Sequence, residues 1–339
     1  MAVLTSVGLE DARRIGREYG LSIASMRGIL AGSVNTNYEC SLEGGGRVFL
    51  RVYEEQDAAG AALEIRLLEH LGSRGVPTVR PLFRTAAGDR DAQTLSSYSG
   101  KAAAIFPWVD GEILCQKRVT PDVMEQVGSA LARIHVAGAD FQGAEPSRFD
   151  ATHLRNRLEK LRAQGYGRAT PGGPVSGGEI GEDVERLSEK LAAHVERERA
   201  RGGPAPASLV HGDVFRDNVL WRDGQMAAVL DFESASLGSV TFDLCVTMLA
   251  WCHGDVLEQP LARALARGYV RERPLTSEDR ERLFDDAVFA ALRFSVTRIT
   301  DYELRPKGTG IYKNYRRFLG RLAAIEGLGA EGLVGFLGI

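Results

Sequence analysis

The first hundred residues alternate short apolar runs with turn residues, a pattern that is typical of a small β-sheet. In the run 47–52, Val48, Leu50 and Val52 fall on one face, because side chains alternate along a strand. Three strands and two helices are expected. The strands are 26–32, 37–43 and 47–55, and the helices are 13–21 and 61–76, with a Gly-Gly-Gly turn at 44–46.

The apolar segment 102–112 contains a proline and, near its end, Asp-Gly, so it suits a last strand that leads into a connector between lobes. After it, the pattern of apolar residues changes from that of strands to that of helices. The segment 120–135 has Thr120 as a helix cap, proline at the first helical position and one apolar stripe. The pattern therefore predicts an α+β, bilobal chain. A small N-terminal lobe with an antiparallel sheet would span 1–105, and a larger, mainly helical C-terminal lobe would span 106–339.

Composition and charge narrow the classes of partner. The 339 residues carry a net charge of −3 with both signs interspersed, so neither nucleic acid nor an anionic membrane surface is an expected partner. The N-terminus lacks a basic start followed by an apolar stretch, and no window approaches 18 uninterrupted apolar residues. A cytoplasmic protein that acts on a small molecule is expected, and nothing in the composition indicates its oligomeric state.

The sequence does not predict a cysteine-based zinc or redox site, a P-loop or a dinucleotide-binding unit. The four cysteines match no zinc or redox spacing, and G-x-x-x-x-G-K-[ST] does not occur. One G-x-G-x-x-G match, at 327–332, lies too close to the end for a following strand and helix. The sequence therefore does not predict a P-loop or a dinucleotide-binding unit.

A polar cluster interrupts the apolar stretch LVHGDVFRDNVLW, 209–221. Two short apolar runs then flank RDGQ at 222–225, which predicts a β-hairpin. If Gly224 and Gln225 form its loop, residue 218 lies opposite residue 231; if Asp223 and Gly224 do, the register shifts by two. In both cases Asn218 and Asp231 lie at the open end of the hairpin.

The side chains at this end are hard oxygen ligands, which Mg²⁺ prefers together with water and substrate phosphates. We expect Asn218 and Asp231 to hold the metal, and Asp213 to accept the proton of an attacking hydroxyl, as in phosphoryl transfer. His211 is expected to brace the loop rather than to exchange protons.

HGDVFRDN at 211–218 and VLDFE at 229–233 resemble the catalytic loop and the metal-binding aspartate of the aminoglycoside phosphotransferase and choline kinase superfamily. LARIH at 131–135 and FDL at 242–244 resemble two further segments of that superfamily. The resemblance implies a protein-kinase-like fold, ATP and Mg²⁺, and a structural role for Asp243 as an anchor of the loop. It also implies that the lobe 1–105 binds the nucleotide and that the lobe 106–339 carries catalysis and substrate binding.

A closer resemblance is to the homoserine kinases of this superfamily. Four segments carry it in order: GSVNTNY at 32–38, VFRDNVLW at 214–221, FDLCVTMLAWC at 242–252 and ALRFSVTRITDYELRP at 291–306. It implies transfer of the γ-phosphate of ATP to the side-chain hydroxyl of L-homoserine, a step toward threonine. The alternatives are a related kinase for choline, hydroxylysine, an aminoglycoside or another amino alcohol, and a relative that binds nucleotide without catalysis.

The nucleotide phosphates are expected at a polar turn between the first two strands. Its candidate residues are Ser33, Asn35, Thr36 and Asn37. The alternative is an ordinary Asn-rich hairpin turn.

Arg51 occupies the strand position at which such kinases normally have a lysine, and residues 1–100 contain no lysine. Arg51 is expected to face the nucleotide and to pair with Glu64, although a forked guanidinium is not equivalent to an ammonium. The alternative for Arg51 is a surface ion pair. Phe106 and Trp108 in the connector are candidates for adenine contacts, and plain packing is the alternative for each.

The region 284–317 contains seven basic and four acidic residues, which favours an anionic acceptor over a polycation. Arg293 and Arg298 are the candidates for binding a substrate carboxylate. They are about 140° apart on a helical wheel, so both need not reach one ligand. The alternative for Arg298 is an ion pair with Asp301.

Overall fold

The computed structural model of the chain describes residues 4–30, 34–85, 94–170, 172–304 and 312–339. Two compact units are present. Unit 1 comprises Met1–Ile113, Asp140–Gly143 and Val219–Glu233, and unit 2 comprises Leu114–Ala139, Ala144–Asn218 and Ser234–Ile339. The boundary predicted between 105 and 106 falls inside a strand, and unit 1 includes the hairpin at 219–233. The assignment of nucleotide and substrate binding to separate lobes stays a prediction.

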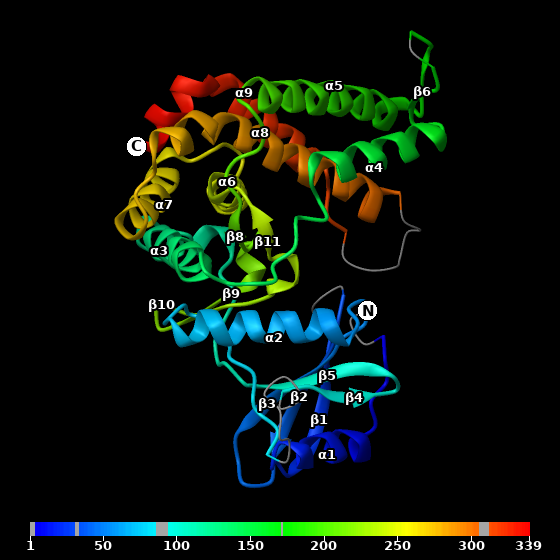
Figure 1. The fold of residues 1–339 in the computed structure, drawn as a ribbon, viewed down its shortest axis with the longest axis vertical. Coiled ribbons are helices and arrows are strands. Elements are labelled where there is room, and N and C mark those ends of the chain that lie inside the picture. The colour runs from blue at the N-terminus through cyan, green and yellow to red at the C-terminus, as the bar shows by residue number, and fades with distance from the viewer. Residues whose placement is uncertain (1–3, 31–33, 86–93, 171, 305–311) are drawn as a thin grey trace. The chain divides into compact units, whose positions relative to one another are not determined.

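Unit 1 is built on a five-stranded antiparallel sheet with strand order β1-β2-β3-β5-β4 (Figure 1). Its strands are β1 (Ile23–Ile29), β2 (Thr36–Leu42), β3 (Arg47–Val52), β4 (Ser96–Tyr98) and β5 (Lys101–Pro107). Its helices are α1 (Leu9–Glu18) and α2 (Ala58–Ser73). The predicted strands and helices are therefore observed with shifted ends. The sequence pattern did not predict β4, whose three residues are too few to show alternation.

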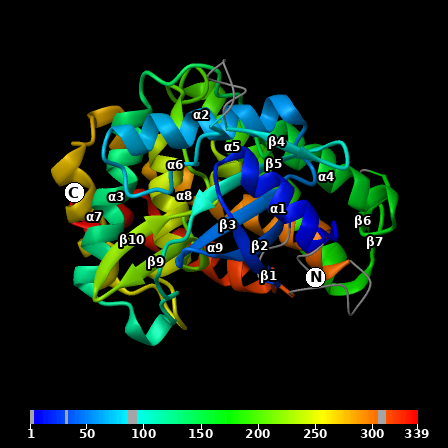
Figure 2. The same ribbon diagram turned by 90° about the horizontal axis from the view of Figure 1, so that it is seen from below.

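The core of unit 1 lies between the sheet and α1 (Figure 2). Val48, Leu50 and Val52 are buried in it, as their alternation along β3 predicts, while Phe49 and Arg51 point to the opposite face. Ile15 of α1 is fully buried against this surface. The side of β3 that carries Arg51 is therefore left for other contacts.

The predicted hairpin forms from β9 (Val219–Arg222) and β10 (Gln225–Val229). Asp223 and Gly224 make the turn with φ of +52° and +75°, which is the left-handed geometry that a two-residue hairpin loop requires. A bulge after Met226 brings Val219 opposite Val229. Because β9 begins directly after Asn218 and β10 ends two residues before Asp231, the two residues flank the open end of one hairpin.

Unit 2 is mainly helical, as predicted. The helices are α3 (Pro121–Gly138), α4 (Ala151–Ala163), α5 (Gly178–Ala200), α6 (Val240–Trp251), α7 (Gln259–Glu272), α8 (Ser277–Arg298) and α9 (Arg316–Leu337), with 3-10 turns η1 (Gln116–Arg118), η2 (Arg216–Asn218) and η3 (Phe232–Ser234), of which η3 begins in unit 1. Thr120 caps α3 by accepting a hydrogen bond from the backbone N–H of Val123. The short strands β6 (Gly167–Arg168) and β7 (Val175–Ser176) pair with each other.

Two glycines allow α3 and α7 to cross closely. A Cβ added at Gly128 would lie 2.1 Å from the carbonyl oxygen of Leu265, and one at Gly268 would lie 2.1 Å from that of Glu125. No side chain fits at either position, so the backbones themselves form the contact.

The centre of unit 2 is α6, in which eleven of the twelve residues are buried. Beside it, β8 (Ser208–Val210) pairs with β11 (Ser236–Gly238), and α8 passes without a break into a π-helical turn, η4 (Ile299–Glu303). Such π-turns inside long helices are frequent at functional sites. In the described ranges, no helix combines the length and the hydrophobicity that crossing a lipid bilayer would demand.

Candidate active site

The segment that carries Asp213 begins where β8 ends, and a buried carboxylate fixes its start. Asp243 of α6 accepts the backbone N–H of His211 at 2.7 Å and that of Gly212 at 2.8 Å. These contacts confirm that Asp243 anchors the loop. The expectation that His211 braces the loop rather than exchanging protons stays a prediction. The ring Nδ1 of His211 lies 3.3 Å from the backbone N–H of Asp213, which donates to it.

Asp243 is fully buried and also bonds to a histidine from α3. His135 Nε2 lies 3.0 Å from Asp243, and His135 Nδ1 lies 2.7 Å from the hydroxyl of Tyr269. Burial raises the pKa of Asp243, but the hydrogen bond and charge of His135 and the contacts of His211 outweigh it, so the pKa is lowered overall. Asp243 therefore stays ionised and accepts several donors at once.

Asp213 and Asn218 are joined within the turn between them. The side-chain nitrogen of Asn218 donates to the backbone carbonyl of Asp213 at 2.9 Å and lies 3.4 Å from its carboxylate. Because the side-chain nitrogen of Asn218 makes this bond, its side-chain oxygen takes no part in it. Trp251 of α6 also stabilises this turn, because its indole N–H donates a hydrogen bond to the carbonyl of Val214 at 2.9 Å.

Gly212 lets Arg293 of α8 approach the backbone of the loop. Gly212 has a φ of +75°, which a residue with a side chain rarely adopts, and its carbonyl accepts a hydrogen bond from Arg293 Nη1. The guanidinium lies over the rings of Phe294 and Phe149, at 4.4 and 4.5 Å from their centroids. Burial lowers the pKa of Arg293 to about 10, while the charges of Asp213 and Asp243 favour its ionised form.

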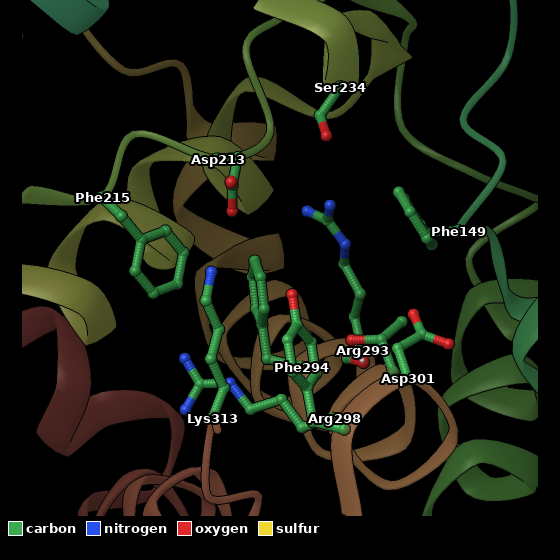
Figure 3. Close-up of a pocket in the computed structure, with 11 residues that line it drawn as sticks. Phe149, Asp213, Phe215, Ser234, Arg293, Phe294, Arg298, Asp301 and Lys313 are labelled. Carbon is green, nitrogen blue, oxygen red and sulfur yellow. Dashed lines mark hydrogen bonds between the residues drawn. The ribbon is translucent and has the colours of Figure 1, made fainter. Parts of the chain in front are cut away.

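A pocket of about 120 Å³ opens beside Asp213 within unit 2 (Figure 3). The residues that line it are Phe149, Asp213, Phe215, Ser234, Arg293, Phe294, Thr297, Arg298, Asp301, Tyr302 and Lys313. In Figure 3 the guanidinium of Arg293 and the amine of Lys313 point toward the carboxylate of Asp213. A small pocket with two carboxylates, of Asp213 and Asp301, and three cationic side chains suits a small acceptor that carries negative charge.

The structure brings Arg293 and Arg298 to this one pocket despite their separation on the helical wheel. The alternative pairing of Arg298 with Asp301 is not formed, because Asp301 binds Arg157 at 2.6 Å. Arg298 instead donates to the carbonyl of Asn314 at 3.1 Å and lies over the ring of Phe318.

Lys313 is a pocket residue that the sequence pattern did not single out. It precedes α9 and lies with its amine 5.7 Å from the centroid of the Tyr302 ring. The available signal was weak: Lys313 is one of only six lysines in the chain.

In unit 1, the predicted pair of Arg51 and Glu64 is formed, with 2.9 Å between Arg51 Nη1 and Glu64 Oε1. Arg51 Nε also donates to the side-chain oxygen of Asn37 at 3.3 Å. Burial lowers the pKa of Arg51, but the charges of Glu64, Tyr53 and Asp231 outweigh it and raise the pKa overall. The side chain of Arg51 is 15% exposed and that of Glu64 is 3% exposed, so the pair is largely shielded from water. A phosphate role for Arg51 stays a prediction.

The polar turn before β2 uses its side chains to hold its own shape. Asn35 accepts the backbone N–H of Glu54 at 3.1 Å and donates to the carboxylate of Glu233 at 2.9 Å. Thr36 donates to Glu54 at 2.5 Å and accepts two backbone N–H groups from residues 4 and 5. Ser33 lies outside the described residues. Phosphate binding by this turn would thus fall to its backbone, and the role stays a prediction.

Asp231 has a strained backbone and an unpaired oxygen. Its φ of +66° is unusual for a residue with a side chain, and such strain clusters at functional sites. Its Oδ1 is buried without a hydrogen-bond partner among the described residues, which fits a carboxylate oxygen that binds a cation. Burial and the nearby charge of Asp231 raise the pKa of Glu233 to about 8. Glu233 is a second acidic residue here that the sequence pattern did not single out.

A cluster of three or more His, Cys, Asp or Glu side chains placed to bind a metal does not occur in the described part of the chain. A magnesium ion held by one amide and one carboxylate would therefore need phosphate and water oxygens to complete its coordination, which is how proteins commonly bind Mg²⁺.

The two connector candidates differ in their contacts. Phe106 is buried in β5, with its ring 6.2 Å from that of Phe49. Trp108 is half-buried, donates to Asp110 at 3.1 Å and lies under the guanidinium of Arg47. Their contacts with adenine stay a prediction.

Comparison with known families decides the class of protein. The model of the phosphotransferase enzyme family matches residues 25–282, which is more than half of the chain. The chain belongs to the phosphotransferase enzyme family. Its matched region contains the anchored loop with Asp213, the hairpin with Asp231 and the buried pair of Arg51 and Glu64.

A curated relative of this phosphotransferase is the homoserine kinase of Methylocella silvestris. The two are 30% identical over 342 residues, which cover 99% of this chain and 100% of the relative.

Solved structures share the fold of this phosphotransferase. A spectinomycin phosphotransferase in complex with ADP and spectinomycin has a TM-score of 0.68 at 11% identity, covering 97% of this chain and 100% of that one. An amicoumacin kinase in complex with AMP-PNP and Ca²⁺ has a TM-score of 0.66 at 12% identity, covering 95% and 93%. The phosphotransferase therefore has the predicted kinase-like fold, with an antiparallel N-terminal sheet and a mainly helical C-terminal part.

Proposed function

We propose that this phosphotransferase transfers the γ-phosphate of ATP to the side-chain hydroxyl of L-homoserine, a step toward threonine. The observation that carries the proposal is the pocket beside Asp213, which is small and lined by Arg293, Arg298 and Lys313. An amino acid offers a carboxylate for these cations and a hydroxyl for the aspartate. A relative that aligns with 99% of this chain is named a homoserine kinase, which supports the same acceptor.

Asp213 is the residue proposed to accept the proton of the attacking hydroxyl. Its backbone is held on both sides, by the anchor of His211 to Asp243 and by the amide of Asn218. This fixes the carboxylate in one place, and positioning supplies much of the rate enhancement in phosphoryl transfer. Arg293 lies beside it, and the opposite charges of Asp213 and Arg293 attract each other.

The acceptor carboxylate is proposed to bind Arg293, Arg298 or Lys313. Arg293 is buried, and its Nε has no hydrogen-bond partner among the residues that the structure describes. An unpaired donor on a buried cation is costly to the fold unless a ligand uses it. A substrate carboxylate can accept such charge-assisted hydrogen bonds, which are stronger than neutral ones.

ATP is the proposed phosphate donor. Asn218 and Asp231 would hold a divalent cation, Mg²⁺, which supplies charge neutralisation for the phosphates when it is bound. The amide oxygen that Asn218 does not use toward Asp213 and the unpaired Oδ1 of Asp231 are the ligand atoms that support this assignment. Arg51 is proposed to bind phosphate oxygens while Glu64 holds it in place, and Asn35, Asn37 and Thr36 shape the neighbouring turn.

A related kinase for choline, hydroxylysine, an aminoglycoside or another amino alcohol is the second candidate. It would use the same Asp213 and differ only in the pocket. Three cationic side chains in a pocket of about 120 Å³ disfavour a quaternary ammonium group and a polycationic sugar. The pocket therefore favours an acceptor with a carboxylate.

The test is ADP release by the purified chain with Mg²⁺ and ATP, comparing L-homoserine, choline, hydroxylysine and kanamycin. Turnover with L-homoserine should exceed that with the other three. The Asp213→Asn variant should lose about 10²–10⁴-fold in kcat, the range typical of a positioned general base, with an unchanged circular dichroism spectrum. A preference for another acceptor would discard L-homoserine, and full activity of Asp213→Asn would discard the role of Asp213.

A further inference from the structure

Four arginines near the turn that carries Asp213 form no ion pair with a carboxylate of the described residues. They are Arg216 of η2, Arg298 at the end of α8, and Arg317 and Arg321 of α9, and together they are called the arginine cluster. Arg216, Arg317 and Arg321 do not line the pocket beside Asp213, whereas Arg298 lines that pocket and also belongs to the cluster. All four residues lie in unit 2.

Two members of the cluster contact the ring of Phe318. The guanidinium carbons of Arg298 and Arg321 lie 4.4 and 4.3 Å from its centroid. Arg317 is one helical turn before Arg321 on α9, so the two side chains share a face. The cluster therefore extends from buried side chains to the surface, since Arg216 is half-buried and Arg317 is exposed.

Two buried members have unsatisfied donors. Arg298 is 9% exposed and Arg321 is 6% exposed, and the Nε of each has no hydrogen-bond partner in the described ranges of the chain. No ion pair joins any of the four to a carboxylate among the described residues. Buried charges in proteins are normally paired. The described part of the fold supplies no carboxylate paired with these arginines, so a bound anion could supply the negative charge.

The cations repel one another. Burial, followed by the charges of Arg298, Arg317 and Arg216, lowers the pKa of Arg321 to about 9. Burial and the charge of Arg317 likewise lower the pKa of Arg298 to about 10. The acidic groups near enough to oppose this are Asp213 and Asp217, which act on Arg298.

His253 experiences the positive charge of two members of the cluster, Arg321 and Arg317. Burial, followed by the charges of Arg321 and Arg317, lowers the pKa of His253, although a backbone carbonyl at 2.9 Å favours its protonated form.

We propose that the arginine cluster is a binding site for a phosphate-group dianion, separate from the acceptor carboxylate and adjoining the pocket through Arg298. Guanidinium groups donate in a fork that matches the oxygens of phosphate, and several of them around one ligand favour two negative charges over one. The ligand is either free inorganic phosphate or the phosphate group of an ester. The site does not depend on which acceptor the enzyme phosphorylates.

Titration calorimetry of the full chain with inorganic phosphate, in a buffer without other oxyanions, tests the proposal. The unmodified chain should bind phosphate at a saturable site, more weakly as ionic strength rises. Arg321→Met keeps most of the side-chain volume and removes the charge, and it should weaken binding about tenfold or more. Arg317→Gln should weaken binding less, because Arg317 is exposed, and it keeps the test valid if Arg321→Met fails to fold.

Arg199→Gln is the matched control, since the side chain of Arg199 is 81% exposed on α5 and it should leave phosphate binding unchanged. Thermal unfolding gives a second readout: phosphate should raise the Tm of the unmodified chain and not that of Arg321→Met. Competition by O-phospho-L-homoserine would show that the site takes a phosphate ester, and its failure would leave inorganic phosphate as the ligand.

Three results would overturn the proposal. They are absence of saturable phosphate binding by the unmodified chain, unchanged phosphate binding in both Arg321→Met and Arg317→Gln, and binding of acetate as tight as that of phosphate.

Discussion

Asp243 accepts the backbone N–H of His211 at 2.7 Å, a hydrogen bond between a helix carboxylate and the first residue of the loop that carries Asp213. Asp243→Asn keeps the shape of the side chain but replaces one acceptor by a donor that faces another donor. We expect a loss of about 1.5–3 kcal/mol in the free energy of unfolding and a lower kcat with little change in KM for ATP. Urea unfolding and steady-state kinetics measure the two effects.

The same substitution has a predicted pH dependence. Because the contacts of Asp243 hold its pKa below the unfolded value of about 3.9, its contribution is full above that pH and is lost as the pH falls further. The stability difference between the unmodified chain and Asp243→Asn should therefore shrink in acid. A difference that stays constant would contradict the role of Asp243 as an ionised anchor.

Arg51→Met should lower kcat/KM for ATP, because the variant removes a buried cation that is proposed to bind phosphate. The expected loss is about 10²–10³-fold, as for other preorganised donors in active sites. Arg51→Lys should recover part of it. Arg27→Met is the matched control, since Arg27 is also on the sheet and its side chain is 80% exposed. Equal kinetics for Arg51→Met and Arg27→Met would restrict Arg51 to a structural role.

Asp286 should make the protein less stable as the pH rises through the weakly acidic range. Burial raises the pKa of Asp286 to about 6, although the hydroxyls of Ser239 and Thr241 donate to it. A folded pKa above the unfolded value means that folding favours the protonated form, so the contribution of Asp286 to stability is greatest below about pH 4 and is lost as the pH rises toward 6. The change is about 2–3 kcal/mol.

Asp286→Asn should remove this dependence, because its amide carries no charge at any of these pH values. Urea unfolding of the unmodified chain and the variant at about pH 4, 5 and 7 measures it. Parallel pH profiles for the two proteins would show that Asp286 is not the group responsible.

Gly128→Ala should destabilise unit 2, because its methyl group would meet the backbone of Leu265 at 2.1 Å. The two helices would have to separate, and such overpacking typically costs about 1–3 kcal/mol. Gly320→Ala on α9 is the matched control, since a Cβ there meets nothing within 4 Å. It should leave stability unchanged or raise it by about 0.5–1 kcal/mol. Similar Tm values for both variants would contradict the close crossing of α3 and α7.

Local patterns predicted much of the fold. The alternation of Val48, Leu50 and Val52 predicts a strand with one buried face, and the structure confirms it. Thr120 and the proline after it predict the start of α3, and Asp-Gly at 223–224 predicts the hairpin turn. Each of these depends on neighbouring residues alone. The sequence left the register of the hairpin open between two possible loops, and the structure forms the loop from Asp223 and Gly224 with a bulge after Met226.

The site was predicted less completely. The motif at 211–218 indicates Asp213 and Asn218, since their spacing within one turn is itself a sequence property, and the resemblance to known kinases adds Asp243 as an anchor. Lys313 and Glu233 were not indicated, because neither belongs to a repeating pattern.

The sequence by itself indicated most elements of unit 1, the candidate residues of the loop with Asp213 and the excess of basic residues in the acceptor region. Only the tertiary structure decided that Arg293, Arg298 and Lys313 meet at one pocket, and that Arg298 also lies beside Arg321 on the ring of Phe318. The physical reason is range: hydrophobic periodicity and caps act over a few residues, whereas these contacts join helix ends whose meeting depends on how α8 and α9 pack.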